Sequence, residues 1–357
     1  MNTEAEIIYA TKHSLSGVAA SAQIKNQIRS FSNLYEDRFA VLYMRKEKEA
    51  DLSDVIEKNF FSIDTLSTLI FFVKSIKFFW SSKKIRFIYT RDLLVAIAAI
   101  CCLKKVVYEC HHLASSKVQF FLKHFSSFIE IVTISQALKE FFVQSYKIPH
   151  KSISVFHDAV DFDLYSQHRE SRDKYRSSLG FLESEVYAVY TGTIGPGRDL
   201  ESFYSAILEN EDIQFIVVGD DGSLFKKNLP ITNFPNNLSF RGYLLQNEVL
   251  KYQIAADILI NLLDECHPNY KYCSQLKLFE YLSTGNIVIS CNIGSLSEVV
   301  NENNSIIYNK SNQPLSDMIC KVSNSLDQFE HIKLNALNFA KKNTWKKRSE
   351  DIINKYI

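Results

Sequence analysis

Short apolar runs alternate with helical segments along most of this chain. Such runs occupy residues 7–10, 39–43, 87–89, 106–108, 131–134, 152–156, 187–191, 214–218, 238–240, 257–262 and 287–290. Strands that alternate with helices pair in parallel through right-handed crossovers. The alternation therefore predicts an α/β chain whose parallel sheets are covered by helices.

Length and composition narrow the class further. A chain of 357 residues predicts roughly two domains, and the polar segment 161–176 is the expected boundary between them. The formal net charge of +1 provides no general attraction for nucleic acid, so we expect none as a partner. Seven cysteines without CxxC or Cys/His spacing predict reduced thiols and no metal site.

Two features bear on the membrane. The N-terminus, MNTEAEIIYATKHS, has acidic residues before a short apolar run, which is not the pattern of a secretory signal. The longest uncharged apolar run, 93–103, is too short to span a bilayer. We therefore expect a cytoplasmic protein.

Residues 59–86 form an unusual aromatic and basic stretch, continued by Phe120, Phe121 and Phe125. It contains Phe60, Phe61, Phe71, Phe72, Phe78, Phe79 and Trp80, interleaved with Lys74, Lys77, Lys83, Lys84 and Arg86. A basic aromatic helix can lie on an anionic membrane surface. A core helix with a solvated lysine face has the same composition, so the sequence leaves both interpretations open.

The stretch 274–298, SQLKLFEYLSTGNIVISCNIGSLSE, predicts a helix, a buried strand and a loop. Lys277 and Glu280 share one face of the helix because they are three residues apart, and Gly285 is suited to end it. Ligands bind outside the carboxyl ends of parallel strands. A carboxylate and an ammonium there can bind a sugar diol and a phosphate, although a surface Lys–Glu pair has the same spacing.

A second candidate site follows the strand at 187–191. The loop GTIGPG, residues 192–197, precedes Arg198 and Asp199 at the start of a helix. Backbone N–H groups and the helix dipole at such a place favour a phosphate. The loop is neither a Walker A nor a GxGxxG motif, which argues against a Rossmann dehydrogenase. An ordinary turn with an exposed arginine is the alternative. The pair Asp220 and Asp221 is interpreted as a turn, since no third metal ligand is near it.

Five segments follow one another in the second half of the chain: YTGTIGPGRDLESFYSAI, FIVVGDDGS, LSFRGYLLQNEVLKYQIAADILI, SQLKLFEYLSTGNIVISCNIGSLSEVV and NTWKKRSEDIINKYI. In their order and spacing they resemble the C-terminal half of the family 4 glycosyltransferases. The first half matches more loosely, through IYTR, VVYECHH, TISQALKEFF and HDAVD.

This resemblance implies the GT-B fold, in which two Rossmann-like doubly wound domains face each other across a cleft. The implied divisions are an acceptor-binding domain at 1–165, a nucleotide-sugar domain at 166–335, and a C-terminal helix at 336–357 that crosses back to the N-terminal domain.

The resemblance also implies roles for individual residues. Glu280 matches the second Glu of the family's paired-Glu motif, which accepts hydrogen bonds from the donor ribose. Arg198 and Lys277 match basic residues at the donor diphosphate. His111 matches a histidine that faces the transferred sugar, with His112 as a rival.

Further residues are implied to contact substrate: Gly17, Arg91, Ser135, Gly192, Gly195, Gly219, Tyr243, Ser274 and Leu278. The sequence departs from the family pattern at three places. Tyr272 stands where the first Glu is usual, Gln275 replaces the usual Pro, and the N-terminal loop has one Gly instead of two.

The implied reaction is retaining transfer of a sugar from a nucleotide-sugar donor to a carbohydrate or lipid-linked glycan acceptor, without cofactor or metal. The expected setting is bacterial surface polysaccharide synthesis (capsule, lipopolysaccharide or exopolysaccharide), with peripheral contact to the cytoplasmic face of the anionic inner membrane. A non-catalytic GT-B subunit that binds glycan or nucleotide, and a GT-B epimerase, are the alternatives.

Overall fold

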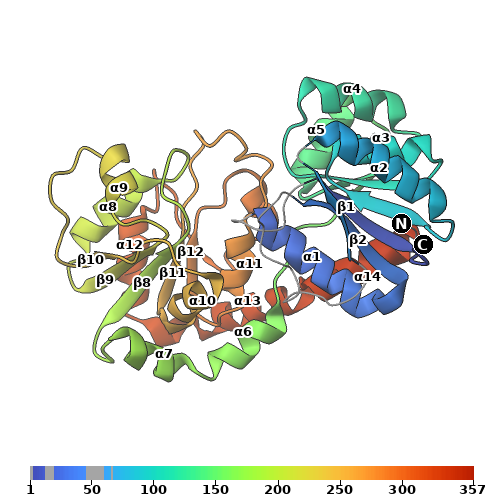
Figure 1. Ribbon diagram of the computed structural model, residues 1–357. Helices are drawn as coiled ribbons and strands as arrows, with labels where there is room; N and C mark the ends of the chain where they lie inside the picture. Colours follow the sequence, from blue (N-terminus) through green and yellow to red (C-terminus); the bar gives the residue numbers. More distant parts are fainter. Residues whose placement is uncertain (1–2, 13–19, 46–59, 66) are drawn as a thin grey trace. The chain divides into compact units, whose positions relative to one another are not determined.

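The structure is a computed structural model that describes residues 3–12, 20–45, 60–65 and 67–357 (Figure 1). The chain divides into two compact units. Unit 1 consists of Met1–Asp158 and Trp345–Ile357, and unit 2 is Ala159–Thr344. Each unit contains its own parallel sheet and its own apolar core.

Unit 1 is built on a sheet whose described strands run in the order β3-β2-β1-β4-β5-β6-β7, with every pair parallel. The strands are β1 Ile7–Thr11, β2 Phe39–Arg45, β3 Phe60–Asp64, β4 Phe87–Thr90, β5 Val106–Cys110, β6 Ile129–Thr133 and β7 Ile153–Val155. The helices are α1 Ala20–Tyr35, α2 Thr68–Ser81, α3 Leu93–Cys101, α4 Ser116–Phe125, α5 Gln136–Tyr146 and α14 Trp345–Tyr356.

Unit 2 repeats the same plan, with strand order β10-β9-β8-β11-β12-β13 among its described residues. The strands are β8 Val186–Thr191, β9 Ile213–Val218, β10 Leu238–Phe240, β11 Ile258–Asn261, β12 Ile287–Ser290 and β13 Ile306–Ile307. The helices are α6 Phe162–Arg169, α7 Arg172–Leu179, α8 Leu200–Glu209, α9 Ser223–Asn228, α10 Gln246–Ala255, α11 Leu276–Leu282, α12 Leu315–Ser323 and α13 Glu330–Lys342.

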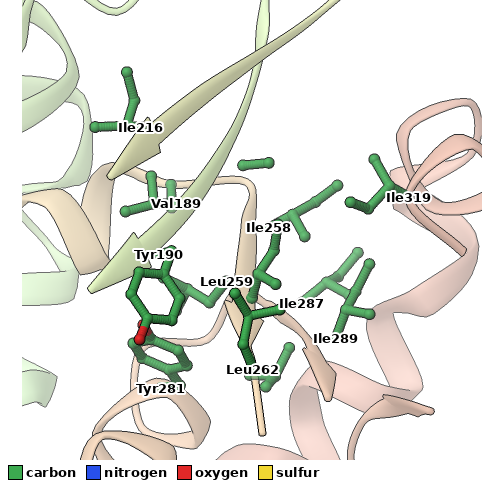
Figure 2. Packing of buried hydrophobic residues seen from close by; sticks show 14 of the residues in the cluster. Val189, Tyr190, Ile216, Ile258, Leu259, Leu262, Tyr281, Ile287, Ile289 and Ile319 are labelled. Carbon is green, nitrogen blue, oxygen red and sulfur yellow. The ribbon is translucent and has the colours of Figure 1, made fainter. Parts of the chain in front are cut away.

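The central strands are apolar because helices cover both faces of each sheet. β1, β4, β5, β11 and β12 are buried along their whole length. Figure 2 shows how strand and helix side chains of unit 2 interdigitate, with Val189, Ile258 and Ile287 from three strands and Ile319 from α12. The α/β prediction is confirmed, and each predicted strand coincides with an observed one to within two residues.

Two expected boundaries differ from the structure. The segment 161–176, expected as the boundary between the domains, lies inside unit 2, which begins at Ala159, and it forms α6 and most of α7. Arg172 and Arg176 anchor α7 through ion pairs with Asp257, at N–O distances of 2.6 and 2.9 Å. The pairing explains why a polar segment is ordered, and it joins residues more than 80 positions apart.

The C-terminal segment 336–357 is also not one helix. The helix α13 ends at Lys342 in unit 2, and α14 begins at Trp345 in unit 1, so the return to unit 1 occurs at 344–345. The α14 side chains Ile352, Ile353 and Tyr356 pack into the core of unit 1. The Ser30 hydroxyl of α1 donates to the Trp345 carbonyl at 2.8 Å.

The described part of the aromatic and basic stretch 59–86 forms more than one element. Its first described part is the edge strand β3, followed by α2, which buries Phe71, Phe78 and Phe79. The core interpretation therefore holds for one face of α2. The opposite face is solvent-exposed and carries Val73 and Trp80, whose exposed fractions are 57% and 70%. Across the described residues, no helix has the length and apolar character needed to cross a membrane.

Candidate functional site

Most residues singled out in the sequence follow strands at the carboxyl edges of the two sheets. In unit 2 the strand order reverses between β8 and β11, and the loop with Gly192, Gly195 and Arg198 follows β8 at this point. In unit 1 it reverses between β1 and β4, and Arg91 follows β4. Ligands of doubly wound sheets bind at such reversal points.

The α11 helix brings Lys277 to the end of β8. The Lys277 ammonium lies 4.0 Å from the centre of the Tyr190 ring, and a Cβ atom at Gly192 would be 3.8 Å from Lys277 Nζ. Among the described residues, this buried Nζ has no hydrogen-bond partner. Burial, and then the nearby charge of Arg198, lower the pKa of Lys277 well below its usual value. An anion bound between these two cations would reverse that shift.

Glu280 is held by a buried amide that the sequence did not single out. Gln253 Nε2 of α10 donates to Glu280 Oε2 at 3.2 Å and to Thr191 Oγ1 at 3.1 Å. Gln253 Oε1 accepts from the Tyr165 hydroxyl at 2.7 Å. Burial raises the pKa of Glu280, while Gln253 and Lys277 oppose the rise. The network fixes the carboxylate beside the end of β8.

The neighbouring Tyr281 fixes the start of the loop. Its hydroxyl accepts a hydrogen bond from the Thr191 backbone N–H at 2.8 Å and lies 3.0 Å from Thr191 Oγ1. Tyr281 lies near Tyr190 in the core of unit 2 (Figure 2). The same helix therefore presents Lys277 and Glu280 and binds the loop that they face.

Arg198 is positioned by a network behind it. Its Nη1 donates to the Leu262 carbonyl at 3.4 Å, and Asp264 N–H donates to the Gly197 carbonyl at 3.0 Å. Lys310 Nζ contacts the carboxylates of Asp199 and Asp264 at 3.0 and 2.5 Å. Asp199 also caps α8 by accepting from the Ser202 N–H. These contacts hold the loop after β11 against the start of α8.

The glycines at this edge of the sheet differ in whether the structure leaves room for a side chain. A Cβ atom on Gly219, whose φ is +113°, would lie 2.6 Å from the Gly192 carbonyl oxygen. The loops after β8 and β9 therefore approach each other only because residue 219 has no side chain. At Gly195, no atom of the described residues lies within 4 Å of the corresponding position, so the space around it does not require glycine.

In unit 1, Arg91 and His111 converge on Glu109, the penultimate residue of β5. Arg91 Nε donates to Glu109 Oε2 at 2.8 Å, and His111 Nε2 lies 3.2 Å from Glu109 Oε1. Arg348 of α14 binds the same Oε1 atom through its Nη2. Burial, followed by the positive charge of Arg91, lowers the pKa of His111 to about 4, so the imidazole is neutral at neutral pH. His112 lies beside His111, and burial lowers its pKa too.

The remaining predicted residues have varied settings. Ser135 caps α5 by accepting from the Leu138 N–H at 3.2 Å, as its place before the helix predicts. Leu278 is fully buried in the core, and its N–H donates to the Gln275 carbonyl. Tyr243 is 70% exposed in the loop after β10, and Ser274 is half-buried just before α11. Gly17 lies outside the described residues.

The acidic pair after β9 forms a turn. Asp220 accepts from the N–H groups of Leu224 and Phe225, and Asp221 accepts from that of Ser223. In the described parts of the chain, no cluster of three or more His, Cys, Asp or Glu could hold a metal ion.

The structure adds residues that the sequence reasoning missed: Glu109, Gln253, Tyr281, Lys310 and Arg348. The first four act on a predicted residue or loop, and Arg348 acts on Glu109. Only Glu109 had a local signal, since it is a charged residue inside a strand that is otherwise apolar and sits two positions before His111.

Comparisons with known proteins agree with this geometry. Residues 192–325 match a family model described as "Glycosyl transferases group 1". A search of curated proteins finds no match.

Similar solved structures cover nearly the whole chain. HepE from Anabaena, solved with UDP and glucose, has a TM-score of 0.74 and 18% identity, and the match covers 98% of this chain and 99% of that one. A glycosyltransferase from Rickettsia africae has a TM-score of 0.77 and 14% identity, over 99% and 98% of the two chains. WaaG, a glycosyltransferase involved in lipopolysaccharide biosynthesis, has a TM-score of 0.63 and 14% identity, over 98% and 99%.

At these identities the solved structures establish the fold, and the family model speaks for residues 192–325. Unit 2 thus contains a domain of the group 1 glycosyltransferases, and the chain as a whole has the GT-B fold.

Proposed function

We propose that this enzyme transfers a sugar from a nucleoside-diphosphate donor to a glycan hydroxyl with retention of configuration, in bacterial surface polysaccharide synthesis. The observation that carries the proposal is the buried Lys277 ammonium, which lacks a hydrogen-bond partner among the described residues and lies near Arg198 at the strand-order reversal of unit 2. A buried ammonium beside a second cation needs an anion, and a diphosphate supplies one.

The chemistry of sugar transfer gives each residue of this site a role. The bond between the sugar C1 and the phosphate oxygen breaks, and the departing diphosphate takes the electron pair. Arg198 and Lys277 stabilise this growing charge. The Glu280 carboxylate accepts hydrogen bonds from the two ribose hydroxyls. The acceptor oxygen forms the new bond to C1, and its proton passes to the departing phosphate. Retention and the role of His111 at the transferred sugar come from the family resemblance.

The proposal is tested with a panel of UDP-, GDP-, dTDP-, ADP- and CMP-sugars in thermal-shift and turnover assays. Solved HepE structures contain UDP or UDP-glucose, so UDP-glucose is the first donor to try. The accepted donor stabilises the fold by an amount set by its concentration relative to its Kd. Binding without turnover would indicate a non-catalytic subunit, and a changed sugar without acceptor would indicate an epimerase.

Glu280→Ala is expected to lower kcat/KM for the accepted donor by about 100-fold, because hydrogen bonds to a charged acceptor contribute about 1.5–3 kcal/mol each. Glu302→Ala is the matched control, since Glu302 is an exposed carboxylate of the same unit. Unchanged turnover of every donor by Glu280→Ala would show that the ribose site is wrongly placed.

We further propose that the acceptor is lipid-linked and that α2 contacts an anionic membrane at its cytoplasmic face. The exposed face of α2 carries Leu69, Ile70, Val73 and Trp80 together with exposed Lys74 and Lys77. Residues 102–104 lie beside it, since Cys102 Sγ contacts the Ile76 carbonyl and Lys104 Nζ donates to that of Ser82. Apolar side chains among lysines match acyl chains below anionic headgroups.

Leu103 makes this surface testable without harming the fold. It is 92% exposed and has a φ of +55°, a conformation that suits asparagine better than leucine. Trp80→Ala/Leu103→Asn is expected to reduce binding to vesicles of phosphatidylglycerol and phosphatidylethanolamine by about tenfold or more, because each buried apolar side chain contributes about 1.5–3 kcal/mol.

The control is Leu334→Asn, which alters an exposed leucine of unit 2. Co-sedimentation at low and high salt measures both effects, and the binding of the unmodified protein should weaken with salt. If the double variant and the unmodified protein sediment equally with the vesicles, or if neither binds, the proposed membrane contact is wrong.

A further inference from the structure

Glu109 is a fully buried carboxylate, and three side chains converge on it. Arg91 approaches one oxygen, and Arg348 and His111 approach the other. Burial alone would raise the pKa of Glu109, but Arg91 and Arg348 hold it well below its usual range. The carboxylate is therefore ionised, and an ionised carboxylate can only accept hydrogen bonds.

This charge decides which nitrogen of His111 carries the proton. His111 Nε2 lies 3.2 Å from Glu109 Oε1, and the contact is electrostatic, since this Nε2 has no hydrogen-bond partner among the described residues. A nitrogen lone pair at that distance from a carboxylate oxygen is repelled, whereas an N–H group is attracted. The neutral ring has a single N–H, so a proton at Nε2 leaves Nδ1 as an acceptor.

The Glu109 carboxylate also orients the Arg91 side chain. Its Nε is held by Glu109, and its Nη1 donates to Gln23 Oε1 at 3.3 Å. Its buried Nη2 has no hydrogen-bond partner among the described residues. The side chain is thereby fixed in place, with one donor group that no described residue uses.

Arg348 supplies the second positive charge. Besides Glu109, it binds Gln27 Oε1 and the His157 carbonyl. Because α14 brings this residue from the C-terminus, the return of the chain to unit 1 adds to Arg91 a second charge that keeps Glu109 ionised.

We infer that Glu109 is a positioning residue for sugar transfer, which keeps His111 in the Nε2–H tautomer and orients the guanidinium of Arg91. The inference rests on the proposed role of His111 at the transferred sugar. It gives β5 and α14 a part in the reaction without either Glu109 or Arg348 touching substrate.

The test compares Glu109→Gln with the double variant Glu109→Gln/Arg348→Met. The single variant leaves two buried arginines without their shared carboxylate, so its Tm should fall. The double variant removes one buried charge of each sign, so its Tm should recover towards that of the unmodified enzyme. A purely structural role would make turnover recover together with the Tm.

We expect turnover not to recover. The kcat of the double variant should remain about 10- to 100-fold low, with a smaller change in the donor KM, which is the range typical of lost outer partners of metal-bound histidines. Long-range ¹⁵N–¹H spectra of histidine-labelled protein, assigned with His111→Gln, should show the Nε2–H tautomer in the unmodified enzyme and a mixture in the double variant.

Full recovery of kcat in the stable double variant, or the same tautomer in both proteins, would overturn the positioning role. A different result would show that the proposed role of His111 at the transferred sugar is wrong. In that case His111→Gln itself keeps full turnover with the accepted donor, whatever the spectra show.

Discussion

Replacing Lys277 with methionine is expected to make the unliganded enzyme more stable while nearly abolishing its activity. The substitution removes a buried ammonium that has no hydrogen-bond partner among the described residues, and it retains an apolar side chain over the Tyr190 ring. For a domain of this size, each kcal/mol of penalty removed should raise Tm by about 2–4 °C. Loss of a cation at the departing diphosphate should lower kcat/KM by about 100-fold or more.

The pH dependence of this gain has a defined sign. The folded-state pKa of Lys277 lies well below the ordinary value of 10.5. Between the two values the unfolded chain binds more protons, so the stability of the unmodified enzyme rises with pH. The Tm advantage of the methionine variant should therefore shrink as pH approaches 10.5.

Calorimetric scans across that range measure the effect, with Lys227→Met as the control because Lys227 is exposed in the same unit. A methionine variant that is less stable than the unmodified enzyme at neutral pH, or that keeps full turnover, would contradict the assignment of Lys277 to the diphosphate.

Gly219→Ala is expected to be the most damaging small substitution at the carboxyl edge of the sheet in unit 2. The added methyl group would lie 2.6 Å from the Gly192 carbonyl oxygen, and the backbone φ of +113° already disfavours any side chain. Strain and overlap with backbone together should lower the free energy of unfolding by about 3 kcal/mol or more. Donor affinity should fall too, because the loop after β8 must move.

Gly195→Ala provides the matched control, because a methyl group there would have no atom of the described residues within 4 Å. Urea unfolding should show little change for Gly195→Ala and a large loss for Gly219→Ala. If the two substitutions have equal effects, the close approach of the loops after β8 and β9 is not required.

The order of elements was accessible from the sequence because it depends on local patterns. Apolar runs of three to six residues predicted the strands. Asp199 marked a helix start where the structure has it, and Gly285 follows the end of α11 by three residues. The motif around Lys277 and Glu280 likewise pointed to a ligand edge, because parallel strands present their carboxyl ends together.

Other features could not be predicted locally. Segment 161–176 was expected to be a domain boundary because its residues are polar, and only the distant Asp257 shows why Arg172 and Arg176 belong in a folded helix. The exposed face of α2 could not be separated from its buried face until Phe71 and Phe78 were seen to pack inward.

The sequence by itself determined that this protein has two series of strands and helices, and which loops carry basic, acidic and glycine residues at strand ends. The tertiary structure alone decided the environment of those residues. Lys277 is a buried cation because it lies over Tyr190, and Glu280 is held because Gln253 reaches it. Glu109 meets Arg348 across 239 positions of sequence. Charge, burial and tautomer depend on such distant neighbours, which no local pattern records.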